Sequence, residues 1–276
     1  MSISSNTFNK EYYYNICLGS EEFKKSKGLV LNQRVKGMID SFNLSQSMDV
    51  LEIGCGRGDT TMYIAKKVNA IVGSDYSRAA IQIANNIKTK YSSQIRKKVK
   101  FKIMKADNLD FKNNSFDMII FIDTIDHLNK TEINKTFKEI LRVLRPNGNI
   151  FIKTCSNRIL LDKTYKYYIF PLNKVFTWID KKIKKIKYES LPHNPRTREA
   201  SEQHINEPDY FYLRKVFERY GLKGSVKAET GFVIQNKSLR SILYNLIVTL
   251  YPFSKYFPLN ILFAHSFSAT LRSKKK

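Results

Sequence analysis

A glycine-rich turn follows the apolar segment 48–53 and opens a helical pattern. Its glycines are Gly54, Gly56 and Gly58, and Glu52 stands two residues before the first. Glycine lets the backbone approach a ligand closely and adopt positive φ angles. A dinucleotide site needs the spacing G-x-G-x-x-G, with a pyrophosphate at the helix N-terminus. Here the spacing is G-x-G-x-G, and a carboxylate at Glu52 repels a pyrophosphate but attracts an ammonium group. The turn therefore disfavours an NAD-dependent oxidoreductase.

Carboxylate and amide side chains follow the next two strand-like segments. Asp75 ends the segment 70–75, where its carboxylate can accept hydrogen bonds from both hydroxyls of a ribose. Asp107 and Asn108 follow the segment 99–104 and can hydrogen-bond an adenine edge. A ligand with an adenine, a ribose and a cationic amino-acid end, but no phosphates, is S-adenosylmethionine (SAM). The sequence therefore predicts SAM as the cofactor, and it predicts no metal site.

These residues stand at the carboxyl ends of segments that alternate between strand and helix patterns. Strand-like runs occur at 48–53, 70–75, 99–104, 116–122 and 149–154, and helical patterns at 59–68, 78–91 and 131–144. Apolar strands that alternate with helices form a parallel sheet covered on both faces. We therefore predict a doubly wound α/β fold with a mostly parallel seven-stranded sheet. Thr131 is the expected cap of the third helix.

The same pattern divides the chain into four parts. Residues 1–47 are expected to form an N-terminal helical cap, and residues 48–155 the SAM-binding core. Residues 156–204 interrupt the alternation and are expected to form an inserted basic lid over the carboxyl edge of the sheet. Residues 205–276 complete the core. Their expected elements are a helix at 207–220 and strands at 222–228 and 264–272.

Composition bears on partners and compartment. Lys and Arg number 48 against 24 Asp and Glu, so an anionic partner or surface has to be considered; codon bias in an AT-rich genome is the alternative source of the excess. Cys17, Cys55 and Cys155 form no CxxC pair, which favours a reducing compartment. The first residues lack a secretory signal pattern, and the apolar run 242–253 is too short for a bilayer. We expect a cytoplasmic protein, soluble or peripheral to the inner face of the membrane.

Five motifs resemble those of class I SAM-dependent methyltransferases, over roughly residues 30–155. They are VLEIGCGRG (50–58), VGSDYS (72–77), KADNLDF (105–111), FDMIIFIDTIDHL (116–128) and LRVLRPNGNIFIKT (141–154). The segment 204–222 is similar to the C-terminal section of the branch that includes quinone-biosynthesis and glycan-cluster methyltransferases. The resemblance implies a Rossmann-like fold, SAM as cofactor and methyl transfer as the activity.

The resemblance also implies which residues contact the cofactor. They are Glu52, Gly54, Gly56, Gly58, Asp75, Tyr76, Asp107, Asn108, Ile122 and Asp123. The glycines would line the methionine moiety, Asp75 would hold the ribose and Tyr76 would flank the adenine. Ile122 and Asp123 would contact the cofactor through their backbone. Arg34, 20 residues before Gly54, would bind the cofactor's carboxylate; an exposed helical arginine is the alternative.

Histidines after the fourth strand suggest how an acceptor is activated. Methyl transfer depends on aligning the nucleophile, and an oxygen nucleophile gains from a base that removes its proton. His127 is the first candidate base, with packing against the following loop as the alternative. His204, beyond the insertion, is the second candidate, and His193 is interpreted as a residue of the lid.

The sequence lacks the motifs of two kinds of nucleic-acid methyltransferase. Adenine amino-methyltransferases carry an Asn/Asp-Pro-Pro-aromatic motif after the fourth strand, where this chain reads IDTID (122–126). Cytosine carbon methylation needs a nucleophilic cysteine. Cys155 superficially fits that role, but the accompanying Pro-Cys element is missing, so we interpret Cys155 as inert. The lysine run at 97–102 and the basic insertion leave an RNA methyltransferase open.

A basic amphipathic helix is predicted over about residues 173–187. Its apolar stripe is Val175, Ile179, Ile183 and Ile186, with Phe176 and Trp178 at the flanks and lysines over the rest. Such a helix suits the surface of an anionic membrane, and the run 242–257 could lie beside it. Packing of the stripe on the core is the alternative.

These observations predict an enzyme that methylates an apolar or lipid-linked small molecule at oxygen. A quinone precursor or a glycan intermediate is the expected acceptor class. An RNA methyltransferase and a catalytically silent SAM-binding partner subunit remain the alternatives.

Overall fold

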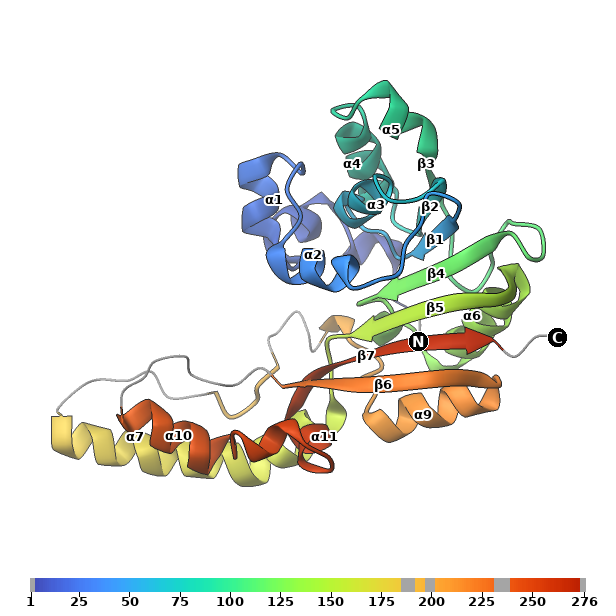
Figure 1. Ribbon diagram of the computed structural model, residues 1–276. Coiled ribbons are helices and arrows are strands. Elements are labelled where there is room, and N and C mark those ends of the chain that lie inside the picture. The colour runs from blue at the N-terminus through green and yellow to red at the C-terminus, as the bar shows by residue number, and fades with distance from the viewer. Residues whose placement is uncertain (1–2, 185–191, 197–201, 231–238, 274–276) are drawn as a thin grey trace.

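The computed structural model describes residues 3–184, 192–196, 202–230 and 239–273. These residues form one seven-stranded sheet with the strand order β3-β2-β1-β4-β5-β7-β6 (Figure 1). The strands are β1 Asp49–Ile53, β2 Ala70–Asp75, β3 Val99–Ile103, β4 Phe116–Ile122, β5 Leu144–Thr154, β6 Leu222–Thr230 and β7 Ala264–Ser273. Strands β1 to β5 pair in parallel, and β7 is antiparallel to both β5 and β6. The predicted fold class is confirmed.

Helices cover both faces of the sheet because the strands are apolar on both sides. Along β4, Ile119 and Phe121 join one apolar cluster, whereas Met118 and Ile120 join the other. The first cluster packs under α6 (Lys130–Val143) and α9 (Tyr210–Arg219). The second packs under three helices, α2 (Gln33–Asp40), α3 (Asp59–Ile64) and α4 (Arg78–Lys88). The short helix α5 (Ser93–Lys98) follows α4.

Local signals shift several predicted boundaries. Helix α6 is capped by Asn129 rather than Thr131, because Asn129 and Glu132 form a reciprocal capping box. Strand β5 begins at Leu144, before the strand predicted at 149–154, and it contains a register shift near Asn147, which has a φ of 62°. Helices α3 and α4 end at Ile64 and Lys88, before the predicted 68 and 91.

The N-terminal segment folds over the glycine turn. It contains the short elements η1 Ser5–Thr7, η2 Tyr12–Ile16 and α1 Ser20–Ser26. The buried guanidinium of Arg57 donates hydrogen bonds to the backbone oxygens of Tyr13 (3.1 Å) and Leu18 (2.8 Å). The hydroxyl of Ser77 donates to the backbone oxygen of Phe8 (2.6 Å). These contacts fix the segment above the carboxyl ends of β1 and β2.

A helical arm, defined here as residues 160–184 and 239–263, extends from the sheet at the end where β4 and β5 terminate (Figure 1). It consists of η4 Leu160–Ile169, α7 Phe170–Lys184, α10 Leu239–Val248, η5 Phe253–Lys255 and α11 Leu259–Phe263. Phe176 of α7 packs edge-on against Tyr244 of α10, with ring centroids 5.7 Å apart. Among the described residues, no helix is long and apolar enough to cross a membrane.

The helix predicted at 173–187 overlaps α7, but its apolar stripe does not pack on the core. Val175 and Ile179 are exposed, as is Trp178, whereas Leu172 and Phe176 join a small apolar cluster of the arm. The side chain of Ile183 and all of Ile186 lie outside the described residues. The face of α7 that packs is therefore adjacent to the predicted one.

Candidate active site

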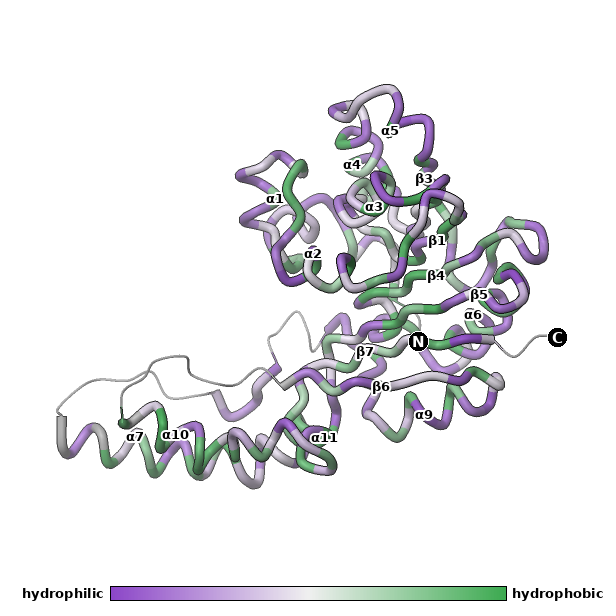
Figure 2. The backbone as a smooth tube through the Cα atoms, viewed as in Figure 1, coloured by the Kyte–Doolittle hydropathy of each residue, from purple (hydrophilic) through white to green (hydrophobic). Residues whose placement is uncertain are grey.

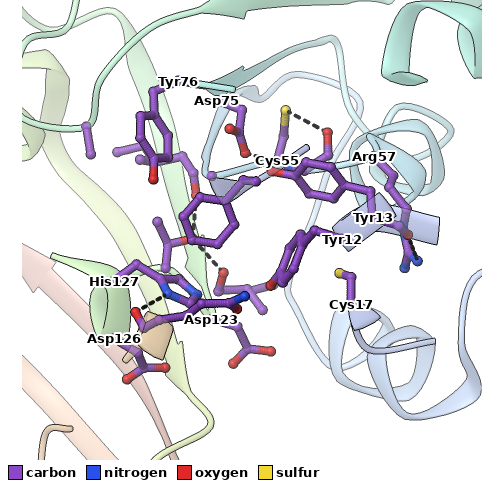
Figure 3. A pocket seen from close by; sticks show the side chains of 18 of the residues that line it. Tyr12, Tyr13, Cys17, Cys55, Arg57, Asp75, Tyr76, Asp123, Asp126 and His127 are labelled. Carbon is purple, nitrogen blue, oxygen red and sulfur yellow. Dashed lines mark hydrogen bonds between the residues drawn. The ribbon is translucent and has the colours of Figure 1, made fainter. Parts of the chain in front are cut away.

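A cavity of about 510 Å³ opens at the carboxyl ends of β1, β2 and β4, under the N-terminal segment (Figure 3). Its volume is in the range of small-molecule sites. The predicted residues that line it are Glu52, Gly54, Gly56, Asp75, Tyr76, Asp107, Ile122, Asp123, His127 and His204. Arg34, Gly58 and Asn108 are not among its lining residues. Elements distant in sequence thus bring ten of the thirteen predicted side chains and glycines to one cavity.

The glycine turn has two different physical requirements. Gly54 has a φ of +73°, and a Cβ placed there would lie only 2.1 Å from the Oγ1 of Thr124. A Cβ on Gly58 would instead meet the side chains of Ala84 and Phe101, each at 2.7 Å. Gly54 therefore keeps the cavity floor open, whereas Gly58 allows α3 to pack against α4 and β3.

The carboxylate of Asp75 is held rigidly at the end of β2. Its Oδ2 accepts a hydrogen bond from the backbone N–H of Gly56 (3.0 Å), and its Oδ1 accepts one from that of Ser77 (2.8 Å). Burial raises the pKa of Asp75 to about 6, so the side chain is mainly ionised at neutral pH. An ionised, fixed carboxylate with remaining lone pairs is a suitable acceptor for two ribose hydroxyls.

Glu52 is a buried carboxyl group at the end of β1. It accepts a hydrogen bond from the hydroxyl of Thr61, and only 3% of the residue is exposed. Desolvation raises the pKa of Glu52 to about 8, because burial penalises the charged form. Its ionised form therefore needs a cation beside it, and the ammonium group of an amino-acid-like ligand is such a cation.

Asp123 marks the end of β4 with a strained backbone. Its φ is 47°, a left-handed value that is uncommon for residues other than glycine and is found often at functional sites. Its Oδ1 accepts a hydrogen bond from the Cys155 thiol (2.9 Å). Burial and the adjacent Asp123 carboxylate raise the pKa of Cys155 well above its usual value. The protonated thiol matches the interpretation of Cys155 as an inert residue.

His127 presents one ring nitrogen for proton transfer. Its Nδ1 lies 2.9 Å from the backbone oxygen of Gln203, and because a carbonyl only accepts, Nδ1 carries the hydrogen. Nε2 then has a free lone pair. Desolvation lowers the pKa of His127, so the imidazole is neutral at neutral pH. The ring packs edge-on against those of Phe8 (5.0 Å) and His204 (5.1 Å).

Asp126 positions this histidine and was not predicted from the sequence. Its fully buried carboxylate accepts hydrogen bonds from the hydroxyls of Thr154 and Ser156 and from the backbone N–H of Cys155. Its backbone oxygen accepts a hydrogen bond from the N–H of Asn206 (3.0 Å). The loop after β4 is therefore tied both to the end of β5 and to the segment that follows the insertion.

Side chains of the N-terminal segment complete the cavity and were also missed. They include Phe8, Tyr12, Tyr13 and Cys17, joined by Arg57 of the glycine turn (Figure 3). Tyr13 covers Gly56, since a Cβ on that glycine would lie 3.4 Å from the tyrosine ring. Element η2, which carries both tyrosines, is a π-helical turn, a feature frequent at functional sites. Three consecutive tyrosines in an otherwise polar segment were the available sequence signal.

The remaining predicted residues lie elsewhere. The guanidinium of Arg34 donates hydrogen bonds to Glu229 (3.2 Å) and to the hydroxyl of Ser266 (3.2 Å), which draws it toward β6 and β7. This placement favours a structural role for Arg34. Asn108 is exposed in the loop after β3. His193 packs against Phe170 of the arm, with ring centroids 5.2 Å apart, and does not line the cavity.

The fold is that of class I SAM-dependent methyltransferases, and comparison with known proteins agrees. Residues 50–148 match the family model described as Methyltransferase domain. Methyltransferase GfsG of Streptomyces halstedii is 29% identical over 126 residues, which cover 45% of this chain and 44% of that protein. The ubiquinone biosynthesis O-methyltransferase of Pelagibacter ubique is 30% identical over 127 residues, or 46% and 48% of the two chains.

The match spans less than half the length of these curated relatives. A solved SAM-dependent methyltransferase structure from Methanosarcina mazei has the same fold, with a TM-score of 0.54 at 17% identity over 90% of this chain and 100% of that one. The chain therefore carries a class I SAM-dependent methyltransferase domain, and SAM is the methyl donor of this class. The open floor at Gly54, the fixed Asp75 carboxylate and the buried Glu52 fit that molecule.

Proposed function

We propose that this protein methylates a hydroxyl oxygen of an apolar small molecule, with His127 as the general base. The observation that carries the proposal is the tethered imidazole, because Nδ1 donates to the Gln203 carbonyl and leaves Nε2 free at the cavity. SAM, when bound, supplies an electrophilic methyl group on a sulfonium.

The cavity residues divide between holding the donor and holding the acceptor. Asp75 accepts hydrogen bonds from the ribose, Tyr76 packs beside the adenine, Asp107 addresses the adenine edge, and Glu52 faces the ammonium group. Ile122 and Asp123 contact the donor through their backbone. The side chains left for the acceptor include an apolar group, beside polar residues of the same cavity such as Asn32, Lys105 and Glu132. The apolar group is Ile3, Phe8, Ile16, Leu31, Val35 and Leu128. An apolar wall beside a neutral base supports a phenol-like or alcohol acceptor over a charged one.

His127 moves the proton in this reaction. With SAM bound, its sulfonium would supply the methyl group and keep the electron pair of the broken methyl–sulfur bond as a thioether. Nε2 of His127 would accept the proton of the acceptor hydroxyl, and the ring would become an imidazolium. The carboxylate of Asp126 stabilises that charge, since its electrostatic effect raises the pKa of His127 against desolvation. His204, edge-on to His127, limits the motion of the ring and borders the same cavity. We assign it a positioning role.

The decisive variant is His127→Gln, compared with His193→Gln as the matched control outside the cavity. The assay is transfer of tritium from methyl-labelled SAM to a catechol that carries an isoprenoid tail, together with SAM binding by calorimetry. We expect His127→Gln to bind SAM like the wild type and to lose about 10²–10⁴-fold in kcat, the usual contribution of a general base. His193→Gln should match the wild type. Equal turnover of His127→Gln and wild type would show that His127 is not the general base.

A further inference from the structure

Helix α10 of the arm has an apolar outward face and an inward face that mixes polar and apolar residues. Ser241 and Asn245 are buried, as are Val248 and the following Thr249. The exposed positions are Leu239, Ile242, Leu243, Leu246 and Ile247, each between 41% and 73% exposed. A helix that faces water normally carries polar residues on its outward face. This helix therefore presents a surface suited to an apolar environment.

The apolar surface continues beyond α10. Phe253, Tyr256 and Phe257 follow it and are exposed, with Leu262 of α11 near them in sequence. Helix α7 lies beside α10 (Figure 1) and also exposes apolar side chains, those of Val175, Trp178 and Ile179. Figure 2 shows the corresponding apolar stretches on α10 and α11, at a distance from the apolar strands of the sheet. Exposed apolar side chains gathered in this way mark an interaction surface.

The charge around this surface has one dominant sign. Segments 156–184 and 239–263 contain nine Lys or Arg residues and two Asp residues, with no Glu. The basic residues with described side chains are Arg158, Lys163, Lys166, Lys174, Lys181, Lys182 and Lys255. The ammonium group of Lys182 lies over the ring of Trp178, 4.6 Å from its centroid. Apolar and aromatic side chains bordered by lysines are the pattern of segments that lie in the interface of an anionic membrane.

We propose that the helical arm docks on an anionic lipid surface, with the outer face of α10 and the aromatic residues 253–257 in the headgroup region. Two copies of the arm would bring together surfaces of the same positive sign, which disfavours a dimer through this face. Anionic headgroups instead complement the lysines.

The arm is attached directly to the wall of the active-site cavity. Asn157, two residues after Cys155, donates hydrogen bonds to the backbone oxygens of Ile261 (2.9 Å) and Ala264 (2.8 Å). The arm and the cavity also lie at the same edge of the sheet (Figure 1). Docking would therefore bring the cavity near the lipid, which deepens the proposed function by making the acceptor a membrane-embedded molecule. This last step alone depends on the proposed function.

Vesicle co-sedimentation of the full chain tests docking without SAM or turnover. The probes are vesicles of phosphatidylcholine alone and of phosphatidylcholine with phosphatidylglycerol, at low and high salt. We expect binding to the anionic vesicles only, weakened by salt. Phe253→Asp should lower the affinity by about tenfold or more, the factor that one inserted aromatic side chain is worth.

Two matched controls separate docking from general surface effects. Phe253 is 60% exposed on the arm, and Phe211 on α9, outside the arm, is 61% exposed. Phe211→Asp should leave vesicle binding unchanged. Lys181→Glu should weaken binding, whereas Lys215→Glu on α9 should not. SAM binding, measured in parallel, should be the same in all four variants, which shows that each one folds.

Three results would overturn the docking proposal. One is absence of wild-type binding to anionic vesicles at low salt, and another is an equal loss in Phe253→Asp and Phe211→Asp. The third is a dimer in light scattering that Phe253→Asp dissociates, without any vesicle binding. A protein that binds vesicles and SAM but methylates no lipid-soluble acceptor would instead contradict the proposed function and leave docking intact.

Discussion

Binding of SAM should release a proton from Glu52, and this release can be measured. The pKa of Glu52 is raised to about 8 by burial. At pH 7 the side chain is then about nine-tenths protonated in the ligand-free protein. An ammonium group placed beside a carboxylate lowers its pKa by about 1–3 units. The pKa in the complex becomes about 5–7, which corresponds to release of about 0.4–0.9 proton per SAM bound at pH 7.

The assay is isothermal titration calorimetry of SAM in buffers with different heats of ionisation. The slope of the binding enthalpy against the buffer heat gives the number of protons exchanged. Glu52→Gln has no proton to release. The amino group of SAM, with a reference pKa of about 7.7–8.0, is already mostly protonated at pH 7, so its own proton uptake is small with either protein. The difference between wild type and Glu52→Gln should therefore be about 0.4–0.9 proton. Asp75, with a pKa of about 6, is already ionised and contributes little.

Glu52→Gln should also fold normally, because the amide resembles the neutral carboxyl group that predominates at pH 7. Its affinity for SAM should fall, since the charge opposite the ammonium group is lost. Tight SAM binding by the wild type with the same proton release as the variant would refute the reasoning, because Glu52 would then not face the ammonium group.

Two further predictions concern the cavity floor and the base. Gly54→Ala should lower the free energy of unfolding by about 1–2 kcal/mol for the left-handed φ alone, and further through the clash with Thr124. Gly37→Ala is the control, because nothing lies within 4 Å of its Cβ, and urea titration that finds the two variants equally stable would contradict the geometry. The rate of methyl transfer should fall as the pH drops through the pKa of His127, which desolvation lowers from 6.5, because only the neutral imidazole accepts a proton. The rate of methyl transfer, measured across the acidic pH range, checks this. A fall in rate on the acid side that is centred above pH 7 would contradict it.

Features set by local sequence were predictable, and the sheet is the clearest case. The strand expected at 116–122 has those limits in the structure, because an apolar run bounded by polar residues defines its own ends. Gly54 and Asp75 were found because their positions at strand ends follow from the alternation of strands and helices. The cap of α6 was misplaced by two residues, since Asn129 and Thr131 are both acceptable capping residues in isolation.

Features that depend on distant contacts were not predictable. Arg34 pairs with Glu229, which is 195 residues away, and no local sequence pattern indicates that partner. Tyr12 and Tyr13 reach the cavity because Arg57 and Ser77 bind the backbone of the N-terminal segment. The outward apolar face of α10 was left open between two alternatives, because periodicity shows that a helix has an apolar side but not whether that side meets the core or an external partner.

Transfer of label from methyl-tritiated SAM into a host-cell extract tests the central claim most directly. The products are divided into organic-soluble, nuclease-sensitive and water-soluble fractions, with wild type and His127→Gln compared. Methylation of an apolar hydroxyl predicts label in the organic fraction that depends on His127. Label confined to the nuclease-sensitive fraction, or organic label that is equal in the two proteins, would contradict the account.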